Sequence, residues 1–186
     1  MNTLDDRFSS EPKELLKSYI DLARFGEDTG VVSHQQADHL FAWSQQRKEE
    51  AQQALESAIE LREAISGIFY AVTRRKPVPA SALAVLNRHV QEAVRHLKLI
   101  PGKRRFEWRF DRGPNDLHAP IWPIARDAAE LLASDRLEFV RACASKSCEW
   151  LFLDESKNHR RRWCDMTKCG NRAKAKRFYA RQKHDD

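Results

Sequence analysis

The sequence predicts a mainly α-helical protein: a helical N-terminal domain with one small β-hairpin, then a small treble-clef-like finger built as knuckle, β-hairpin, knuckle and helix. Apolar residues recur at helical spacing through most of residues 10–133, and strand-like alternation replaces that period only around residues 97–111. All four cysteines lie between residues 143 and 169. We place the two domains at residues 1–136 and 137–186.

Length and composition set the first limits. A chain of 186 residues suits one medium domain, or one domain with a small appendage, and can bury a real core. The first 14 residues are polar and acidic, unlike a secretory signal, and no apolar run is long enough to span a bilayer. We therefore expect a cytoplasmic protein that makes no use of a membrane.

The first two helices are predicted over Ser10–Phe25 and His34–Gln46. The first carries apolar residues on one side and meets a plausible stop at Gly26. The second begins after a capping box, in which Ser33 caps the helix and Gln36 reaches back to it.

A long helix follows over about residues 47–73, with one charge, Arg62, in its apolar stripe. Three basic residues and Pro77 end it. The next helix is predicted over residues 80–96, with a buried face. The residues of that face are Leu83, Leu86, Val90, Ala93, Val94 and Leu97.

Alternation then predicts a hairpin that turns at Pro101-Gly102. Its second strand would bury Phe106, Trp108 and Phe110 on one face. A last helix of this domain is predicted over residues 117–133.

Catalytic motifs are missing from the N-terminal sequence. It contains no Gly-rich phosphate loop, no G-x-S-x-G and no H-E-x-x-H, and its histidines are scattered. We therefore expect no enzyme. A small-molecule ligand or a homodimer interface remains open as the role of this domain.

The cysteines have the spacing of a tetrahedral metal site. Cys143 and Cys148 form one C-x4-C pair, Cys164 and Cys169 form another, and fifteen residues separate the pairs. Two disulfides or an iron–sulfur cluster would also use four cysteines, but a reducing compartment favours metal over disulfides. We expect one structural Zn²⁺, with no open position for catalysis.

The finger is predicted to place a β-hairpin between its two knuckles. Residues 149–154 form one strand, residues 155–159 give a polar turn, and residues 160–163 form the return strand. That hairpin would bring Cys164 beside Cys148. A helix is expected over residues 171–182, packed on the hairpin through Ala175, Phe178 and Tyr179.

The positive charge is confined to the finger. Residues 1–140 carry 20 Lys+Arg and 21 Asp+Glu, a net of −1, whereas residues 141–186 carry 13 and 6, a net of +7. Such a patch on a metal-stabilised unit can face a polyanion, although a solvated basic tail would have the same composition. The preferred phosphate contacts are Arg161, Lys174, Arg177 and Arg181.

Several further residues have structural roles in this interpretation. Gly170 lets the backbone pass close to a sulfur, and Asn171 caps the last helix. Arg172 lies in the first helical turn, where the helix dipole disfavours it, so it would offset the charge of a zinc–thiolate site or bind a phosphate. Arg162 could pair across the hairpin with Asp154.

These residues carry a family resemblance. Residues 137–183 closely resemble the CGNR zinc finger in the four cysteines, the D-x-S at 154–156, the R-W-C at 162–164, the C-G-N-R at 169–172 and the basic helix. The preceding region is similar to the ABATE-type domain that accompanies this finger. The resemblance implies a bacterial, stress-induced or other transcription regulator whose partner is double-stranded DNA.

Two other classes of function remain open. The basic helix could meet an acidic protein, which would make the finger a zinc-stabilised interaction module of the transcription machinery. The finger could also bind RNA by stacking aromatic side chains on bases, although Phe178, Tyr179 and the tryptophans are more simply explained as core.

Overall fold

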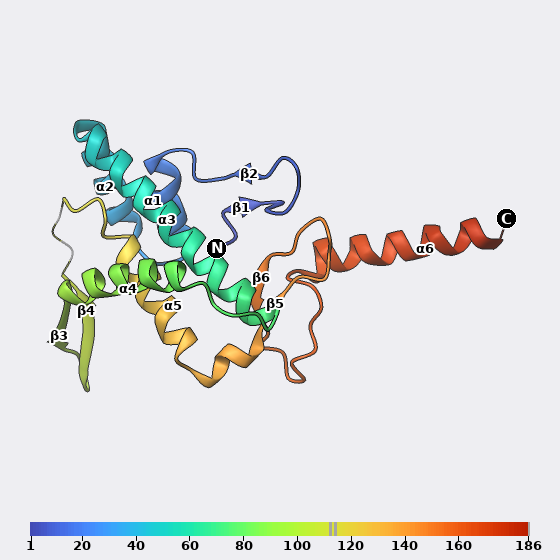
Figure 1. The fold of residues 1–186 in the computed structure, drawn as a ribbon. Coiled ribbons are helices and arrows are strands. Elements are labelled where there is room, and N and C mark those ends of the chain that lie inside the picture. Colours follow the sequence, from blue (N-terminus) through green and yellow to red (C-terminus); the bar gives the residue numbers. More distant parts are fainter. Residues whose placement is uncertain (112, 114, 186) are drawn as a thin grey trace.

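The computed structural model describes residues 1–111, 113 and 115–185, without the side chains of residues 179–181 and 183–185. Helices account for about 54% of the chain, which confirms the predicted mainly helical class (Figure 1). The helices are α1 (Tyr19–Asp28), α2 (His34–Gln46), α3 (Lys48–Thr73), α4 (Ala80–Arg95), α5 (Ile121–Leu132) and α6 (Asn171–Asp185). In the described chain, no helix is both long enough and apolar enough to cross a bilayer.

Six short strands pair as three antiparallel hairpins. They are β1 (Leu4–Asp5) with β2 (Lys13–Glu14), β3 (Leu97–Pro101) with β4 (Phe106–Phe110), and β5 (Val140–Ala142) with β6 (Leu151–Leu153). A 3-10 helix spans Asp135–Phe139, and a π-helical turn spans Met166–Gly170.

Helix α3 is the centre of the fold. It is 26 residues long and contributes residues such as Leu61, Ile68 and Phe69 that are almost fully buried. Helices α1, α2, α4 and α5 and strand β5 all contact it. The main core cluster therefore forms around this single long helix, because its amphipathic neighbours bury apolar side chains against α3.

The first helix is shorter than predicted. It begins at Tyr19 and not near Ser10, because Lys13 and Glu14 pair with β1 as strand β2. Asp21 holds the new start, since its Oδ2 accepts hydrogen bonds from the N–H of Lys17 (3.0 Å) and Ser18 (2.8 Å). The capping box predicted for α2 is confirmed.

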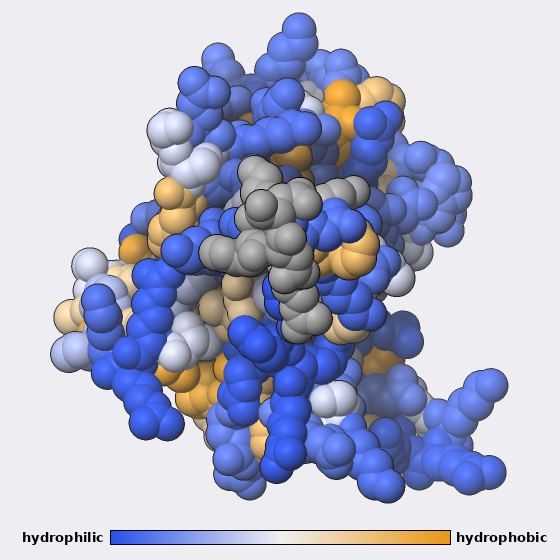
Figure 2. Space-filling view, turned by 90° about the vertical axis from the view of Figure 1, so that its right-hand side faces the viewer, coloured by the Kyte–Doolittle hydropathy of each residue, from blue (hydrophilic) through white to orange (hydrophobic). Residues whose placement is uncertain are grey.

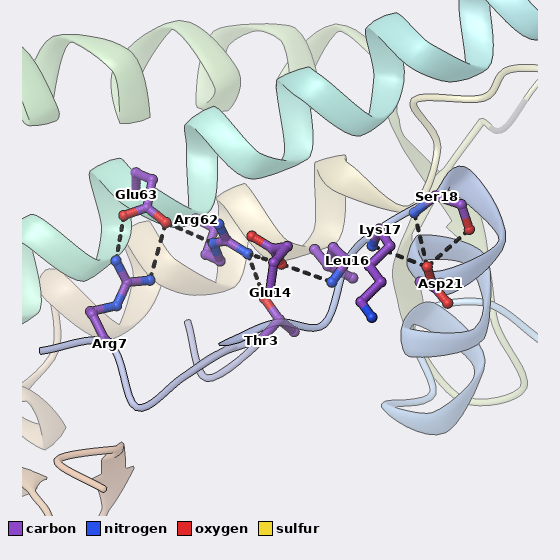
Figure 3. Close-up of polar contacts among 9 residues, drawn as sticks. All are labelled: Thr3, Arg7, Glu14, Leu16, Lys17, Ser18, Asp21, Arg62 and Glu63. Carbon is purple, nitrogen blue, oxygen red and sulfur yellow. Dashed lines mark hydrogen bonds and ion pairs between the residues drawn. The ribbon is translucent and has the colours of Figure 1, made fainter. Parts of the chain in front are cut away.

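Arg62, the charge in the apolar stripe of α3, is buried and fully engaged (Figure 3). Its guanidinium donates to Glu14 Oε1 at 2.6 Å and to Glu63 Oε1 at 2.8 Å, and it reaches Thr3 Oγ1 at 3.4 Å. Arg7 pairs with the same Glu63 carboxylate. The network fastens the β1–β2 segment to α3, which explains why a charge is tolerated there.

The apolar faces predicted for α4 and the β3–β4 hairpin are only partly covered. Leu86 and Ala93 are buried as predicted, but Leu83 and Val94 are exposed. On the hairpin, Phe110 packs against the small cluster of Ala93, Ala119 and Trp122, while Phe106 and Trp108 stay exposed. The prediction of one buried hairpin face is therefore wrong at its outer end, because no other element of the described chain covers it.

The third hairpin joins the two parts of the chain. Val140 of β5 and Leu151 of β6 belong to the main core, and the boundary predicted at residues 136 and 137 falls inside the 3-10 helix. The side-chain amide of Asn2 accepts from Leu151 N–H (3.2 Å) and donates to Leu151 O (2.8 Å). Trp150 Nε1 donates to Asp5 Oδ1 at 3.0 Å. The start of the finger is thus built into the helical domain.

Replacing Arg62 tests the importance of its network. Arg62→Met keeps the apolar stem but leaves Glu14 without its partner, so we expect a loss of about 2 kcal/mol in the free energy of unfolding, measured by urea denaturation. Arg88→Met, which breaks an exposed pair with Glu60, is the matched control and should cost less than about 0.5 kcal/mol. Equal losses in the two variants would contradict a special role for Arg62.

The same network predicts a pH dependence. Burial raises the pKa of Glu14, but hydrogen bonds from Arg62 and from the Leu16 N–H outweigh it, and the pKa lies below its ordinary 4.5. A carboxyl with a lowered folded-state pKa stabilises the fold above about pH 4.5, and this contribution is lost as the pH falls through the folded-state value. Arg62→Met should therefore lose less stability than the wild type between about pH 5 and pH 3. Parallel pH profiles would contradict this.

Candidate metal centre

The four cysteines converge on one point. Their Sγ atoms all lie within 4.8 Å of one another, with Cys148–Cys164 at 3.6 Å and Cys164–Cys169 at 3.7 Å. A tetrahedral zinc ion with Zn–S bonds of about 2.3 Å requires sulfurs about 3.8 Å apart, so the set fits one ion. A disulfide needs about 2.05 Å. An iron–sulfur cluster spreads its four cysteines over two or four irons, so cysteines on different irons lie further apart than these sulfurs do. The geometry therefore supports one zinc ion with four thiolate ligands.

Burial gives the site its electrostatic character. Cys143 and Cys169 are buried, and Cys148 and Cys164 are partly exposed. Burial raises the pKa of Cys148 to about 11 and also raises that of Cys164. Burial acts in the same direction on Cys143, but backbone N–H groups of Cys164 and Ser145 hydrogen-bond its sulfur and bring the pKa below its ordinary value. A bound cation would stabilise all four thiolates, so metal binding releases protons.

The first knuckle lies inside the β5–β6 hairpin. Cys143 follows β5 and donates its N–H to Trp150 O at 2.8 Å, and Cys148 N–H closes a turn onto Ser145 O at 3.0 Å. Glu149 then adopts a left-handed conformation with φ of 53°. Tyr70 Oη donates to Glu149 O at 2.8 Å, so the end of α3 holds the residue next to a ligand.

The strand pairing predicted for the finger is wrong. Strand β6 pairs with β5 and not with residues 160–163, which form no strand. These residues instead pass the first knuckle, where Ala144 N–H donates to Arg162 O at 2.8 Å. Cys164 is still brought beside Cys148, by this backbone bond and by the hydrogen bond from its own N–H to the Cys143 sulfur.

Asp154 determines the path of the intervening loop. Its carboxylate is fully buried and accepts from Ser156 N–H (3.1 Å), Ser156 Oγ (2.6 Å) and Arg161 N–H (2.8 Å). Burial raises the pKa of Asp154, but these hydrogen bonds outweigh it and lower the pKa. The predicted pair between Arg162 and Asp154 does not form, because the carboxylate is occupied by the loop. The Arg162 guanidinium lies 5.4 Å from the centre of the Trp163 ring.

Asp165, which sequence reasoning missed, positions the second pair. Its Oδ1 accepts from Thr167 N–H at 2.7 Å and Lys168 N–H at 3.2 Å, which caps the π-helical turn that carries Cys169. Asn171 has helical angles (φ −66°, ψ −42°) and so lies inside the helix, which corrects its predicted role as the cap. An aspartate two residues before a threonine is a common capping signal and could have identified Asp165.

Gly170 lies close to the Met166 side chain and not to a cysteine sulfur. A Cβ at this position would lie 2.9 Å from Sδ and Cε of Met166 and 3.4 Å from Trp163 Cδ1. The close approach predicted for this residue is therefore correct in kind, but its neighbour is Met166. Because Met166 is flexible and half exposed, a small side chain here is accommodated at modest cost.

Comparison with known families gives two matches. The profile of the ABATE family, described as "putative stress-induced transcription regulator", covers residues 1–135, and that of the CGNR zinc finger covers residues 140–182. The first match alone spans well over half of the chain. The chain belongs to the ABATE family. The resemblance seen in the sequence is thereby confirmed for both parts. A comparison with curated proteins gives no match.

Two arginines of the CGNR finger hold its parts together. Arg172 donates from Nη1 to Ser147 Oγ at 2.9 Å, which ties α6 to the first knuckle beside Cys148. Arg161 donates from Nη2 to Cys164 O at 2.7 Å and lies over the Phe152 ring. The guanidinium of Arg161, predicted as a phosphate contact, thus makes its contacts within the finger.

A cationic cleft of about 580 Å³ lies beside the four cysteines. Its charged lining residues are Lys146, Arg162, Arg172, Lys176 and Arg177. Of the four predicted phosphate contacts, Arg177 lines the cleft, Lys174 is exposed outside it, and the side chain of Arg181 lies outside the described residues. Sequence reasoning missed Lys146, inside the first knuckle, and Lys176, one helical turn after Arg172.

Helix α6 projects away from the rest of the molecule (Figure 1). Its main contacts are with the π-helical turn before it, and Ala175 and Phe178 are exposed. The prediction that these two residues pack on the hairpin is wrong, because the β5–β6 hairpin is used by the ABATE domain; Tyr179 lies outside the described side chains. The end of the molecule that carries α6 is largely hydrophilic (Figure 2).

The metal assignment predicts a change in zinc content. Cys164→Ser removes the thiolate with two close sulfur neighbours, so bound zinc should fall from one ion per chain to at most about a tenth of that after gel filtration. Elemental analysis by mass spectrometry measures it. Ser147→Ala, in the first knuckle but outside the ligand set, should keep its zinc. Full zinc in the Cys164 variant would contradict the site.

Proposed function

We propose that this protein is a zinc-dependent transcription regulator that binds double-stranded DNA through its CGNR finger and catalyses no reaction. The observation that carries the proposal is the cationic cleft beside the four cysteines. Zinc is structural in this proposal, because four thiolates complete its coordination.

The positive charge of the cleft is only partly offset within the described residues, since a zinc ion with four thiolates carries a formal charge of −2 against five cations. In the described part of the chain, no carboxylate pairs with Lys146, Arg162, Arg172, Lys176 or Arg177. The contacts of Arg172 and Arg177 are with a hydroxyl and a backbone carbonyl, which leave the positive charge in place. Five unpaired cations around one cleft repel each other, and phosphate groups would offset that repulsion.

The projecting helix suits a duplex. The major groove of DNA is wide enough to admit one α-helix, and a helix must stand clear of its own domain to enter it. Helix α6 does so and carries Lys174 on its exposed surface. Arg172 and Lys176 lie at its base in the cleft, where phosphates at the groove edge would be met.

The ABATE domain would regulate this binding. Two roles are predicted for this domain, the binding of a small-molecule ligand and the formation of a homodimer. A cleft of about 410 Å³ between α4 and the start of α5, lined by His89, His96 and His118, has the size of a small-ligand site and supports the ligand prediction.

The test is a salt series of binding to duplex DNA by the zinc-loaded protein. The triple variant Arg172→Ala, Lys176→Ala and Arg177→Ala should bind at least about tenfold more weakly and lower the slope of log K against log salt by about two to three. The control variant, Lys17→Ala with Arg24→Ala, removes two positive charges that lie far from the cleft in the sequence. Its slope should be nearly unchanged.

Three results would count against the proposal. The first is an unchanged slope in the triple variant with full zinc content. The second is a preference for RNA over duplex DNA. The third is nuclease-insensitive capture of one acidic protein, which would favour the interaction module.

A further inference from the structure

The outer half of the β3–β4 hairpin presents an unusual surface. Five residue pairs are in register, and they place Leu99 opposite Trp108 and Pro101 opposite Phe106 on one face. Phe106 is 65% exposed, Trp108 58% and Leu99 53%. Large aromatic side chains at such exposure in a soluble fold commonly mark a binding surface.

The hairpin is well fixed to the ABATE domain. At its base, Phe110 packs against Trp122, whose indole is stacked on His96 at a ring distance of 3.7 Å. Asp111 N–H adds a hydrogen bond to His96 O at 2.6 Å. At its tip, Gly102 donates to Arg105 O at 2.9 Å in a turn with no room for a Cβ. The exposed aromatics therefore stand on a rigid support.

Positive charge surrounds these aromatics. Residues 97–111 hold five Lys+Arg against two Asp+Glu, a net of +3, which leaves −4 for the rest of residues 1–140. Lys103, Arg104 and Arg105 form the tip and are all exposed. Within the described residues they have no carboxylate partner, whereas Lys98 pairs with Asp111.

We infer that this hairpin face binds single-stranded DNA by stacking bases on Phe106 and Trp108 while the tip cations bind phosphates. Base stacking on exposed aromatics beside a basic strip is a general way to hold unpaired strands, whereas a duplex keeps its base faces covered. Phe106 and Trp108 lie about 6.6 Å apart along β4, about twice the rise of a base, which leaves room for one base between them.

The choice of occupant follows from charge and area. A second copy would bring the same uncompensated cations, and three exposed apolar residues fall well short of the roughly 800 Å² per partner of a stable dimer. The preference for DNA over RNA rests on the proposed function. The stacking itself does not, because it uses a surface separate from the finger.

The experiment measures binding of a thymidine oligonucleotide to the full-length, zinc-loaded protein by anisotropy and tryptophan quenching. Phe106→Leu with Trp108→Leu keeps apolar surface but removes the π faces, so affinity should fall at least about tenfold. In the wild type the oligonucleotide should quench the fluorescence of Trp108, taken as the difference between the wild type and Trp108→Leu; absence of this quenching would contradict the inference. Leu83→Ala with Val94→Ala, exposed apolar positions on α4, is the matched control and should bind normally.

Parallel measurements separate this inference from the proposed function. The hairpin variant should keep duplex binding, and the cleft triple variant should keep Trp108 quenching. Unchanged affinity in the hairpin variant overturns the inference, as does stronger binding to an RNA oligonucleotide. Two other results would overturn it if the oligonucleotide does not bind. One is binding to phosphatidylserine vesicles that the hairpin substitutions abolish. The other is a dimer in sedimentation that the same substitutions abolish. Loss of duplex binding alone leaves the hairpin inference intact.

Discussion

The finger depends on a balance of charge at four sulfur atoms. Thiolates whose Sγ atoms all lie within 4.8 Å repel one another strongly, and burial, which raises the pKa values of Cys148 and Cys164, adds to the cost of ionising them. A divalent cation removes this cost, and its binding energy then becomes folding energy. Loops that make few other contacts can thus be held in one arrangement, including the second knuckle and the cleft.

The finger has an anchored half and a projecting half. The β5–β6 hairpin shares the core of the ABATE domain, and Asn2 and Tyr70 bond directly to its backbone. The second knuckle and α6 have little contact with that domain; the Ala144–Arg162 and Arg172–Ser147 hydrogen bonds link them to the first half, and a zinc ion on the four cysteines would add a further link. A change in the helical domain would therefore reach the cationic cleft through Glu149, which Tyr70 holds, and the adjacent ligand Cys148.

Local signals in the sequence predicted the features that depend on local chemistry. Cysteine spacing identified the metal site, and Ser33 with Gln36 identified the start of α2. The partner of β6 could not be read in this way, because an alternating stretch fits any neighbouring strand, and the burial of Asp154 decides the path of the loop. Alternation at Phe106 and Trp108 likewise showed a common face but not whether another element covers it. Asn171 was predicted as the cap because the π-helical turn at Met166–Gly170 before α6 was not foreseen.

Hydrogen–deuterium exchange with and without a chelator tests most directly whether zinc couples the projecting half of the finger to its anchored half. The structure predicts that zinc removal lowers protection in the second knuckle and also in β5, in β6 and at the end of α3 near Tyr70, while α1 and α2 stay protected. Loss of protection confined to residues 164–185 would contradict the claim, because the anchored half would then fold without the metal.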